Sequence, residues 1–180
     1  MNKTFTLLFA GLLSLGPIGM AQATPLDLTG FDVFESEGGS VVESGGTVSF
    51  TENSTDAALF FYNDTFDVAS DATTLSFNYE FALGEFDEGD YLQFNINYGE
   101  EWLVDVTGTG HVEIDMTSYQ GQQISLDWAL IWDLDDYAGT TGSISNIDLA
   151  TSGAPVPEPA TMLLLGTGLV GLVGARRKKH

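Results

Sequence analysis

The sequence predicts an all-β protein, an antiparallel two-sheet sandwich of the jelly-roll type, and three observations support this fold class. Apolar and polar residues alternate with a period of two over successive short segments. Gly, Asn, Asp and Ser cluster between these segments, as in turns between antiparallel strands. No segment in the middle of the chain keeps a helical period over three turns. About eight to ten short strands at this spacing favour a two-sheet sandwich.

The clearest strand predictions lie in the middle of the chain. Residues 75–83 and 91–98 place Leu, Phe, Tyr and Ile on one face and mostly polar side chains on the other. Further strands are expected, in chain order, at residues 47–51, 57–62, 102–106, 112–116, 124–132 and 143–149. Residues 57–62 are apolar on both sides, which indicates a strand that is covered on both faces.

Charge is distributed very unevenly along the 180 residues. None of the five Lys and Arg residues lies between positions 24 and 154, whereas 25 of the 26 Asp and Glu residues do, Glu158 being the exception. A body of this charge repels phosphates, which excludes nucleic acid as a partner. The carboxylates are therefore balanced either by diffuse salt or by bound divalent cations. The chain has no cysteine, so thiol chemistry and thiolate metal sites are excluded.

Two acidic turns are candidate metal sites, and calcium is the ion that oxygen-rich turns suit best. The candidate ligands are Asp87, Glu88, Asp90, Asp133, Asp135 and Asp136. Neither turn is an EF-hand, because a loop starting at Asp133 would place Ala138 where Gly is required and Ile144 where the bidentate Glu is required. The alternative is that both are solvated acidic turns.

A polar strand face is the candidate glycan surface. Its expected contact residues are Tyr91, Gln93, Asn95 and Asn97. We expect Ser76, Asn78 and Glu80 on the neighbouring strand, and Tyr119 or Tyr137 to stack on a sugar ring. The alternative is an ordinary solvated sheet face.

No catalytic group is predicted. His111 is the only histidine of the body, it begins a strand, and no nucleophile elbow accompanies it. Glu113 and Asp115 are similar to the alternating carboxylates of jelly-roll glucanases, but Thr117 stands where a third carboxylate is needed. We therefore interpret Glu113 and Asp115 as an outer polar face.

The N-terminus has the features of a secretory signal peptide. Lys3 precedes an apolar segment at residues 5–15, and Ala21-Gln22-Ala23 forms the small-x-small pattern that signal peptidase recognises. Cleavage after Ala23 would leave Thr24 as the first mature residue. An uncleaved membrane anchor is the alternative, and both interpretations place the body outside the cytoplasm.

The C-terminus combines three parts in a fixed order. They are the motif Val156-Pro157-Glu158-Pro159, an uncharged Leu- and Gly-rich segment at 160–175, and the cations Arg176, Arg177, Lys178 and Lys179. Sixteen helical residues span about 24 Å, somewhat less than a hydrocarbon core of about 30 Å. Snorkelling of the first arginines covers the difference, and anionic cytoplasmic headgroups attract the four cations. We therefore predict a transmembrane helix at 160–175 that ends in a membrane stop.

This tail resembles the PEP-CTERM sorting signal of Gram-negative bacteria. The resemblance implies that an exosortase in the inner membrane recognises the tail and processes the protein near the motif. The resemblance covers only about 25 of the 180 residues, and it concerns the localisation of the protein rather than the activity of its body. The precursor is expected to cross the inner membrane, stay anchored in it transiently, and reach the cell surface or the exterior.

The body resembles the carbohydrate-binding-module-like sandwiches often found before such tails. Phe31, the turn at residues 87–91 and the closing segment 144–149 are the basis of this resemblance. The predicted organisation is a signal peptide at 1–23, a sandwich at 24–150, a linker at 151–155 and a sorting signal at 156–180. The predicted function is that of a non-catalytic surface or matrix protein that binds calcium, exopolysaccharide or both. A small secreted glycan-active enzyme with unrecognised carboxylates is the alternative.

Overall fold

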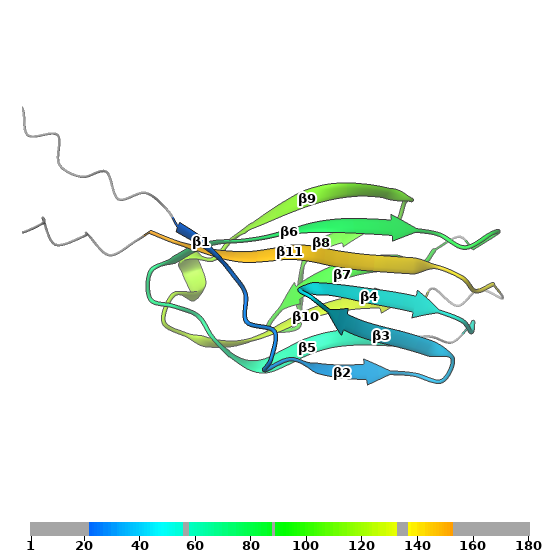
Figure 1. The fold of residues 1–180 in the computed structure, drawn as a ribbon, viewed down its shortest axis with the longest axis horizontal. Helices are drawn as coiled ribbons and strands as arrows, with labels where there is room; N and C mark the ends of the chain where they lie inside the picture. The colour runs from blue at the N-terminus through cyan, green and yellow to red at the C-terminus, as the bar shows by residue number, and fades with distance from the viewer. Residues whose placement is uncertain (1–21, 56–57, 88, 133–136, 153–180) are drawn as a thin grey trace, which may run out of the picture. The chain divides into compact units, whose positions relative to one another are not determined.

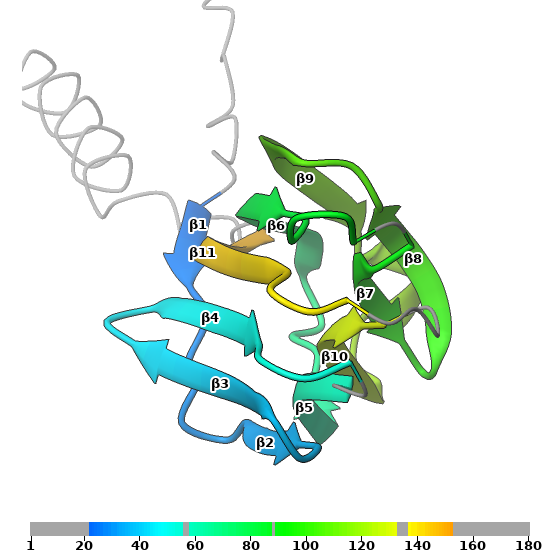
Figure 2. The same cartoon turned by 90° about the vertical axis from the view of Figure 1, so that its right-hand side faces the viewer.

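The structure, a computed structural model, describes residues 22–55, 58–87, 89–132 and 137–152. In these residues two antiparallel sheets pack face to face (Figures 1 and 2). Sheet A has the order β3-β4-β11-β6-β9, with β1 also paired to β11, and sheet B has the order β2-β5-β10-β7-β8. Among these strands, most connections from β2 onward cross between the sheets, as in a jelly roll. The predicted fold class is therefore confirmed for the body.

The strands are mostly short, and three strand pairs contain a register shift. They are β1 Gln22–Pro25, β2 Asp32–Glu35, β3 Gly39–Ser44, β4 Thr47–Glu52, β5 Ala58–Asp67, β6 Ala72–Ala82, β7 Tyr91–Ile96, β8 Gly99–Val104, β9 Gly108–Asp115, β10 Gln123–Ile131 and β11 Thr141–Thr151, with a 3₁₀ helix, η1, at Thr117–Tyr119. Within the described ranges, no helix is long and apolar enough to cross a membrane. The expected signal helix and the expected transmembrane helix at 160–175 both lie outside the described residues.

The segments in which apolar and polar residues alternate form strands, as predicted. The first three strands, β1 to β3, form without a clear alternating pattern. Every residue of β1 and β2 is exposed, so neither strand shows the apolar periodicity by which a half-buried strand is recognised. In β3, Val41 is buried and Val42 is half exposed, which gives a pattern too short to predict a strand. β1 and β2 form by pairing with strands that are distant in the sequence, β11 and β5, whereas β3 forms a hairpin with the next strand, β4.

The first and last strands of the sandwich lie side by side. Gln22 pairs with Thr151, and Pro25 pairs with Asp148. The expected sandwich boundaries, 24 and 150, fall within two residues of these strand ends, and the domain assignment stays a prediction. Cleavage after Ala23 would cut β1 in its middle and leave two of its four paired residues on the mature chain.

The core is built around Trp128 of β10. Its side chain is fully buried, and its ring centroid lies 4.9 Å from that of Phe94 and 5.7 Å from that of Phe77. Phe94 belongs to sheet B and Phe77 to sheet A, so the indole joins the inner faces of both sheets. Because side chains alternate along a strand, Asp127 and Ala129 must face outward from sheet B. This alternation creates the surface described next.

Candidate functional site

A groove lies on the outer face of sheet B. It has a volume of about 370 Å³, and its lining residues are Phe34, Phe60, Tyr62, Asp64, Tyr98 and Asp127. We refer to it as the aromatic groove. Phe34, Phe60, Tyr62 and Asp127 come from the neighbouring strands β2, β5 and β10. Asp64 lies further along β5, where its pairing with β10 is irregular, and Tyr98 lies in the β7–β8 turn. An apolar surface with a few polar groups is the usual composition of a small-ligand site.

The register of sheet B assembles the groove. Phe34 of β2 pairs with Phe60 of β5, and their rings meet edge to face at 5.9 Å. Tyr62 of β5 pairs with Asp127 of β10, which in turn pairs with Asn95 of β7. The rings of Phe34, Phe60 and Tyr62 therefore lie on β2 and β5, next to Asp127 on β10 and Asn95 on β7.

Asp127 forms the polar floor of the groove. It is only 7% exposed although it faces outward, because the neighbouring rings cover it. The side-chain amide of Asn95 donates a hydrogen bond to Asp127 Oδ1 at 2.6 Å. Burial raises the pKa of Asp127, the Asn95 hydrogen bond opposes this shift, and the nearby charge of Asp64 adds to it. A carboxylate held in this way favours a ligand that donates hydrogen bonds or carries positive charge.

The β7–β8 turn delivers Tyr98 to the rim of the groove. Asn97 and Tyr98 both have positive φ angles, of 51° and 62°, as the two central residues of a tight hairpin require. Asn97 Oδ1 accepts a hydrogen bond from the backbone N–H of Ser125 at 3.1 Å. The Tyr98 side chain is 81% exposed, and its hydroxyl donates to Asp64 at 3.4 Å.

The structure groups some of the expected glycan-contact residues and separates others. Tyr91, Gln93 and Asn95 share the outer face of β7, because Leu92, Phe94 and Ile96 point into the core. Asn97 instead bonds to the backbone of β10. The expectation that residues 76–80 lie on the neighbouring strand is wrong, because β6 belongs to sheet A and β7 pairs with β10 and β8.

The aromatic partners expected for a sugar also lie elsewhere. The Tyr119 hydroxyl donates to Glu101 at 3.0 Å, and Tyr137 packs against Phe86 with ring centroids 5.9 Å apart. The rings that line the groove are instead Phe34, Phe60 and Tyr62. The expectation that residues 57–62 are covered on both faces is wrong, because the outer side of β5 lines the groove. One feature of the sequence indicates the floor of the groove: Asp127 is a carboxylate in the middle of the apolar segment 124–132.

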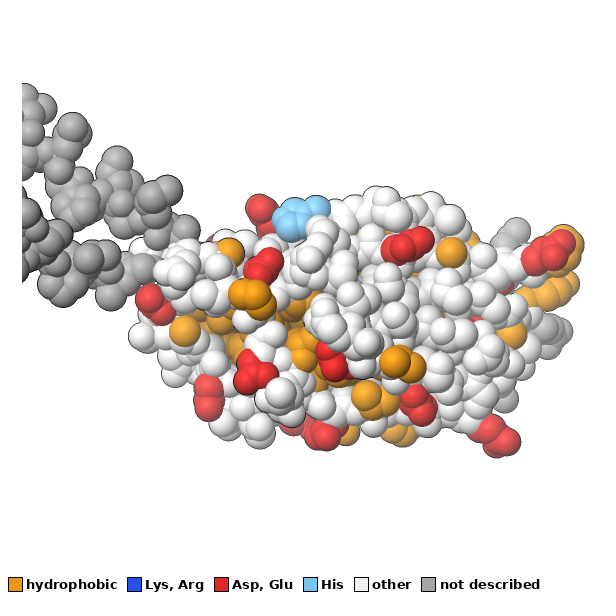
Figure 3. All heavy atoms as spheres, viewed as in Figure 1, with side chains coloured by type: hydrophobic (Ala, Val, Ile, Leu, Met, Phe, Trp, Pro, Cys, Tyr) orange, Lys and Arg blue, Asp and Glu red, His pale blue; other side chains and the backbone are white. Residues whose placement is uncertain are grey.

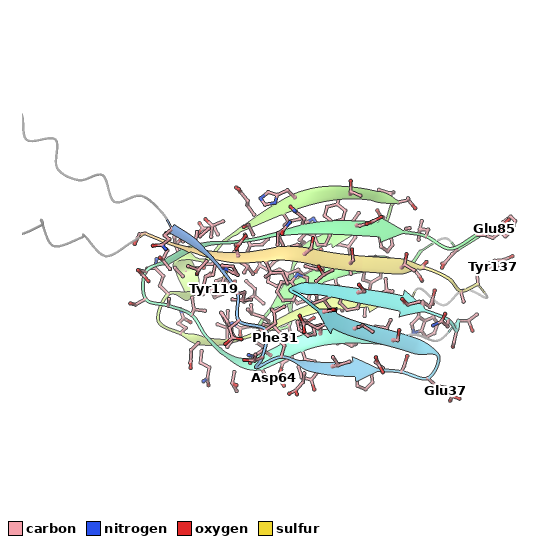
Figure 4. The ribbon with its side chains drawn as sticks, in the orientation of Figure 1. Phe31, Glu37, Asp64, Glu85, Tyr119 and Tyr137 are labelled. Atoms are coloured by element: carbon pink, nitrogen blue, oxygen red, sulfur yellow. The ribbon has the colours of Figure 1, made fainter. Side chains whose placement is uncertain are left out.

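A second cluster lies inside the end of the sandwich formed by loops 83–90 and 137–140, which we call the apex. Figure 4 shows two labelled residues of these loops, Glu85 and Tyr137, at this end. Here Glu52, Asp87 and Asp90 each place one carboxylate oxygen within 4.8 Å of the others. We refer to these three residues as the carboxylate triad. All three side chains are at most 3% exposed.

The apex loops are cross-linked through the triad. Thr140 Oγ1 donates to Asp87 Oδ2 and accepts from the backbone N–H of Gly84, while the N–H groups of Gly139 and Thr140 donate to Glu52 Oε2. The two loops approach so closely that a Cβ added at Gly84 would lie 2.9 Å from the carbonyl oxygen of Ala138. These contacts hold the triad in place from both loops.

The chemistry of the triad fits a divalent cation. Among the described residues, Oδ1 of Asp87 has no hydrogen-bond partner, although it is buried and the residue is only 3% exposed. Two oxygens bound to one calcium ion at about 2.4 Å are at most about 4.8 Å apart, which matches the spacing of the triad. No Lys or Arg occurs in residues 24–154, so no lysine or arginine in the described part of the chain can neutralise these carboxylates, and a cation from solution can do so.

The triad includes two of the six expected metal ligands and one residue that was not expected. Asp87 and Asp90 belong to it, whereas Glu88, Asp133, Asp135 and Asp136 lie outside the described residues. Glu52 comes from the end of β4, some 35 positions earlier in the chain than Asp87. The role of the six expected residues as metal ligands stays a prediction.

His111 lies on the opposite sheet from the groove. It is on β9, bonded to Asn78 at 2.8 Å and within 3.5 Å of Glu113, and its side chain is exposed. Glu113 and Asp115 are also exposed, which agrees with their interpretation as an outer polar face. Figure 3 shows acidic side chains spread over one face of the body.

The ionisation of Glu52 makes the stability of the metal-free protein depend on pH. Burial is the largest cause that raises the pKa of Glu52 from its usual 4.5 to about 7. The charges of Asp90 and Asp87 also raise this pKa, whereas the hydrogen bond from the Thr140 N–H lowers it. A carboxyl group whose pKa is raised by folding stabilises the folded state below its unfolded pKa, and this stability is lost as pH rises through the folded value. In EDTA we therefore expect the contribution of Glu52 to lower the melting temperature as the pH rises from about 4.5 to about 7.

Tryptophan fluorescence measures this transition, because all three tryptophans, at 102, 128 and 132, lie in the body. Glu52→Gln should flatten the dependence on pH, and Glu113→Gln on the exposed face of β9 should leave it unchanged. A melting temperature that rises over this interval in EDTA would contradict the account of Glu52.

The fold and these two sites define a class: an acidic jelly-roll sandwich with an open aromatic groove and a buried cluster of carboxylates. Comparison with protein families identifies the tail, because residues 155–178 match the PEP-CTERM protein-sorting motif. Comparison with curated proteins finds no significant match.

Solved structures that resemble the body include carbohydrate-binding modules. A mutant of a family 29 module is 12% identical, with a TM-score of 0.47, over 77% of this chain and 96% of its own. A family 61 module solved with β-1,4-galactotriose is 15% identical, with a TM-score of 0.47, over 68% of this chain and 89% of its own.

The secreted serine protease VesC from Vibrio cholerae also matches. It is 11% identical, with a TM-score of 0.51, over 66% of this chain and 24% of its own. The chain thus spans about a quarter of the length of VesC, and at this identity the likeness concerns the fold alone. The PEP-CTERM motif, by contrast, implies an exported, membrane-anchored precursor that an exosortase processes for surface localisation.

Proposed function

We propose that the protein is a non-catalytic surface or matrix protein of a Gram-negative bacterium that binds polysaccharide in the aromatic groove. Signal peptidase removes residues 1–23, and the helix at 160–175 holds the precursor in the inner membrane. The exosortase acts near residues 156–159, beyond a short linker that follows β11. The sandwich is the part delivered outward.

The observation that carries this proposal is the composition of the groove. Phe60 and Tyr62 present half-buried rings beside Asp127 and Asn95, on a sheet face with room for a ligand. The apolar face of a sugar ring stacks on aromatic rings, while its hydroxyls bond to carboxylate and amide groups. Because the groove lies on an open surface, it can bind a segment of a polysaccharide chain.

A calcium ion at the carboxylate triad completes the proposal. The ion would neutralise Glu52, Asp87 and Asp90 and brace the two apex loops through the contacts of Thr140. The ion would stabilise the fold and would not contact the polysaccharide, because the triad and the groove share no lining residue.

Removal of the groove aromatics tests the proposal. For the full chain purified in a neutral detergent, Phe60→Ala and Tyr62→Ala should each weaken binding to the best oligosaccharide of a panel about tenfold or more, because each removes a stacking surface. Calorimetry in the presence of calcium measures the affinity. Phe86→Ala, which removes a 70% exposed ring at the apex, is the matched control and should bind normally. Equal losses in all three variants, or no binding by any oligosaccharide, would refute a glycan site in the groove.

The alternative function, a glycan-active enzyme, has one observation in its favour. Asp64 and Asp127 line the same groove, and glycoside hydrolysis requires two carboxyl groups across the scissile bond. Prolonged incubation with the oligosaccharide panel, followed by mass spectrometry, should show intact substrates. Cleavage that disappears in Asp127→Asn would replace the non-catalytic proposal with the enzymatic one.

A further inference from the structure

The aromatic groove has unbalanced negative charge on its polar side. Asp127 lies on its floor with one hydrogen bond from Asn95, and Asp64 lies on its rim with one from Tyr98. Both donors are neutral, so neither compensates the charge of the carboxylate. The two carboxylates repel each other, because the charge on Asp64 contributes to the raised pKa of Asp127.

Nothing elsewhere in the body supplies the missing positive charge. Residues 24–154 contain 25 acids and no Lys or Arg. His111, the one histidine in this range, is on β9 of sheet A and bonds to Asn78 there, whereas the groove is on the outer face of sheet B. No lysine or arginine of the body complements the charge of the groove, so a cationic ligand can displace the solution ions that otherwise balance it.

This charge distribution selects among sugars. A uronic acid polymer brings further carboxylates and is repelled, whereas a neutral sugar can stack and donate hydroxyl hydrogen bonds but leaves both charges uncompensated. An amino sugar with a free amine can stack one face on Phe60 and Tyr62 and place its ammonium group against Asp127 or Asp64. Its hydrogen bonds to these carboxylates are charge-assisted, and the adjacent rings attract the cation as well.

We infer that the aromatic groove selects cationic amino sugars, that is, hexosamine residues with free amines in a polysaccharide. This inference rests on the proposed glycan-binding function and names the class of sugar that the groove prefers. The sugar ring lies on the β2–β5 side of the groove, and the ammonium group lies over the carboxylates.

The test compares oligomers of equal length that differ in charge. The full chain in neutral detergent is titrated calorimetrically with glucosamine, N-acetylglucosamine, neutral mannose and galacturonate oligomers, in the presence of calcium. At about pH 6 an amine is protonated and an ordinary carboxyl group is ionised. The glucosamine oligomer should bind about tenfold more tightly than its N-acetylated counterpart, as one charge-assisted hydrogen bond predicts.

Variants then locate the effect. Asp127→Asn and Asp64→Asn should each remove most of this preference and leave the affinity for the N-acetylated oligomer nearly unchanged. Glu113→Gln removes the same charge from the exposed face of sheet A and should preserve the preference. Thermal melting of each variant by tryptophan fluorescence verifies that the sandwich is folded.

The outcomes separate the inference from the proposed function. Equal affinity for the glucosamine and N-acetylated oligomers, tighter binding of galacturonate, or an equal loss in Glu113→Gln would overturn the inference. If neutral oligomers bind and the amine adds nothing, glycan binding stands and selectivity for amino sugars fails. If no oligomer binds, both fail.

Discussion

Calcium at about 1 mM is expected to raise the melting temperature of the body by about 8–10 °C over EDTA at equal ionic strength. A ligand at about a hundred times its dissociation constant stabilises a protein by about 2.7 kcal/mol, and a domain of this size gains about 3–4 °C per kcal/mol. The physical reason is the carboxylate triad, whose three buried acids repel one another until a cation joins them. Tryptophan fluorescence of the full chain in neutral detergent measures the shift.

Variants of the triad distinguish a specific site from general screening. Asp87→Asn and Glu52→Gln should lose most of the calcium shift, and both should melt higher than the unmodified protein in EDTA at about pH 8 because one buried charge is gone. Glu85→Gln, an exposed acid on the same apex loop, is the matched control and should keep the full shift. Identical melting curves in calcium and EDTA at matched ionic strength would eliminate the metal site.

Trp128→Ala is expected to cost about 3–5 kcal/mol of unfolding free energy, the largest effect of any single substitution proposed. The indole is fully buried and packs against Phe94, Phe77 and Phe31, so its loss leaves a cavity that both sheets border. Because small domains are stable by only about 5–15 kcal/mol, the variant should be close to unfolding at growth temperature.

Urea titration of the full chain, followed through Trp102 and Trp132, measures this change in free energy. Trp128→Phe keeps most of the ring volume and should recover a large part of the loss. Phe86→Ala removes an exposed ring at the apex and should change stability by less than about 0.5 kcal/mol. A cost below about 1 kcal/mol for Trp128→Ala would mean that the indole does not organise the core.

Part of the groove could be predicted and part could not, and β5 shows the difference. Its apolar character on both sides was visible in residues 57–62, but a strand covered on both faces and a strand with an aromatic binding face share that pattern. Only the pairing of β5 with β2 and β10 places Phe34 and Asp127 beside Phe60 and Tyr62. The amide side chains of β7 were predicted correctly as an outer face, but their partners were assigned to the wrong sheet.

The carboxylate triad was found only in part for a similar reason. The acidic turn around Asp87 and Asp90 indicated a metal site by its local concentration of carboxylates. Glu52 gave no such signal, because it ends an ordinary alternating strand, β4. Its carboxylate reaches the triad through the packing of β4 beside β11 and the return of the chain at Thr140.

The sequence by itself determined the fold class of the body, its lack of cysteine and of lysine or arginine, and the sorting motif at residues 155–178. These properties depend on periodicity, composition and contiguous motifs, which are local in the chain. Tertiary structure alone decided which strand faces lie together, and with them the aromatic groove and the carboxylate triad. In a sandwich whose successive strands mostly change sheets, spatial neighbours are distant in sequence, so cross-strand pairing and burial, rather than any motif, bring the site residues together.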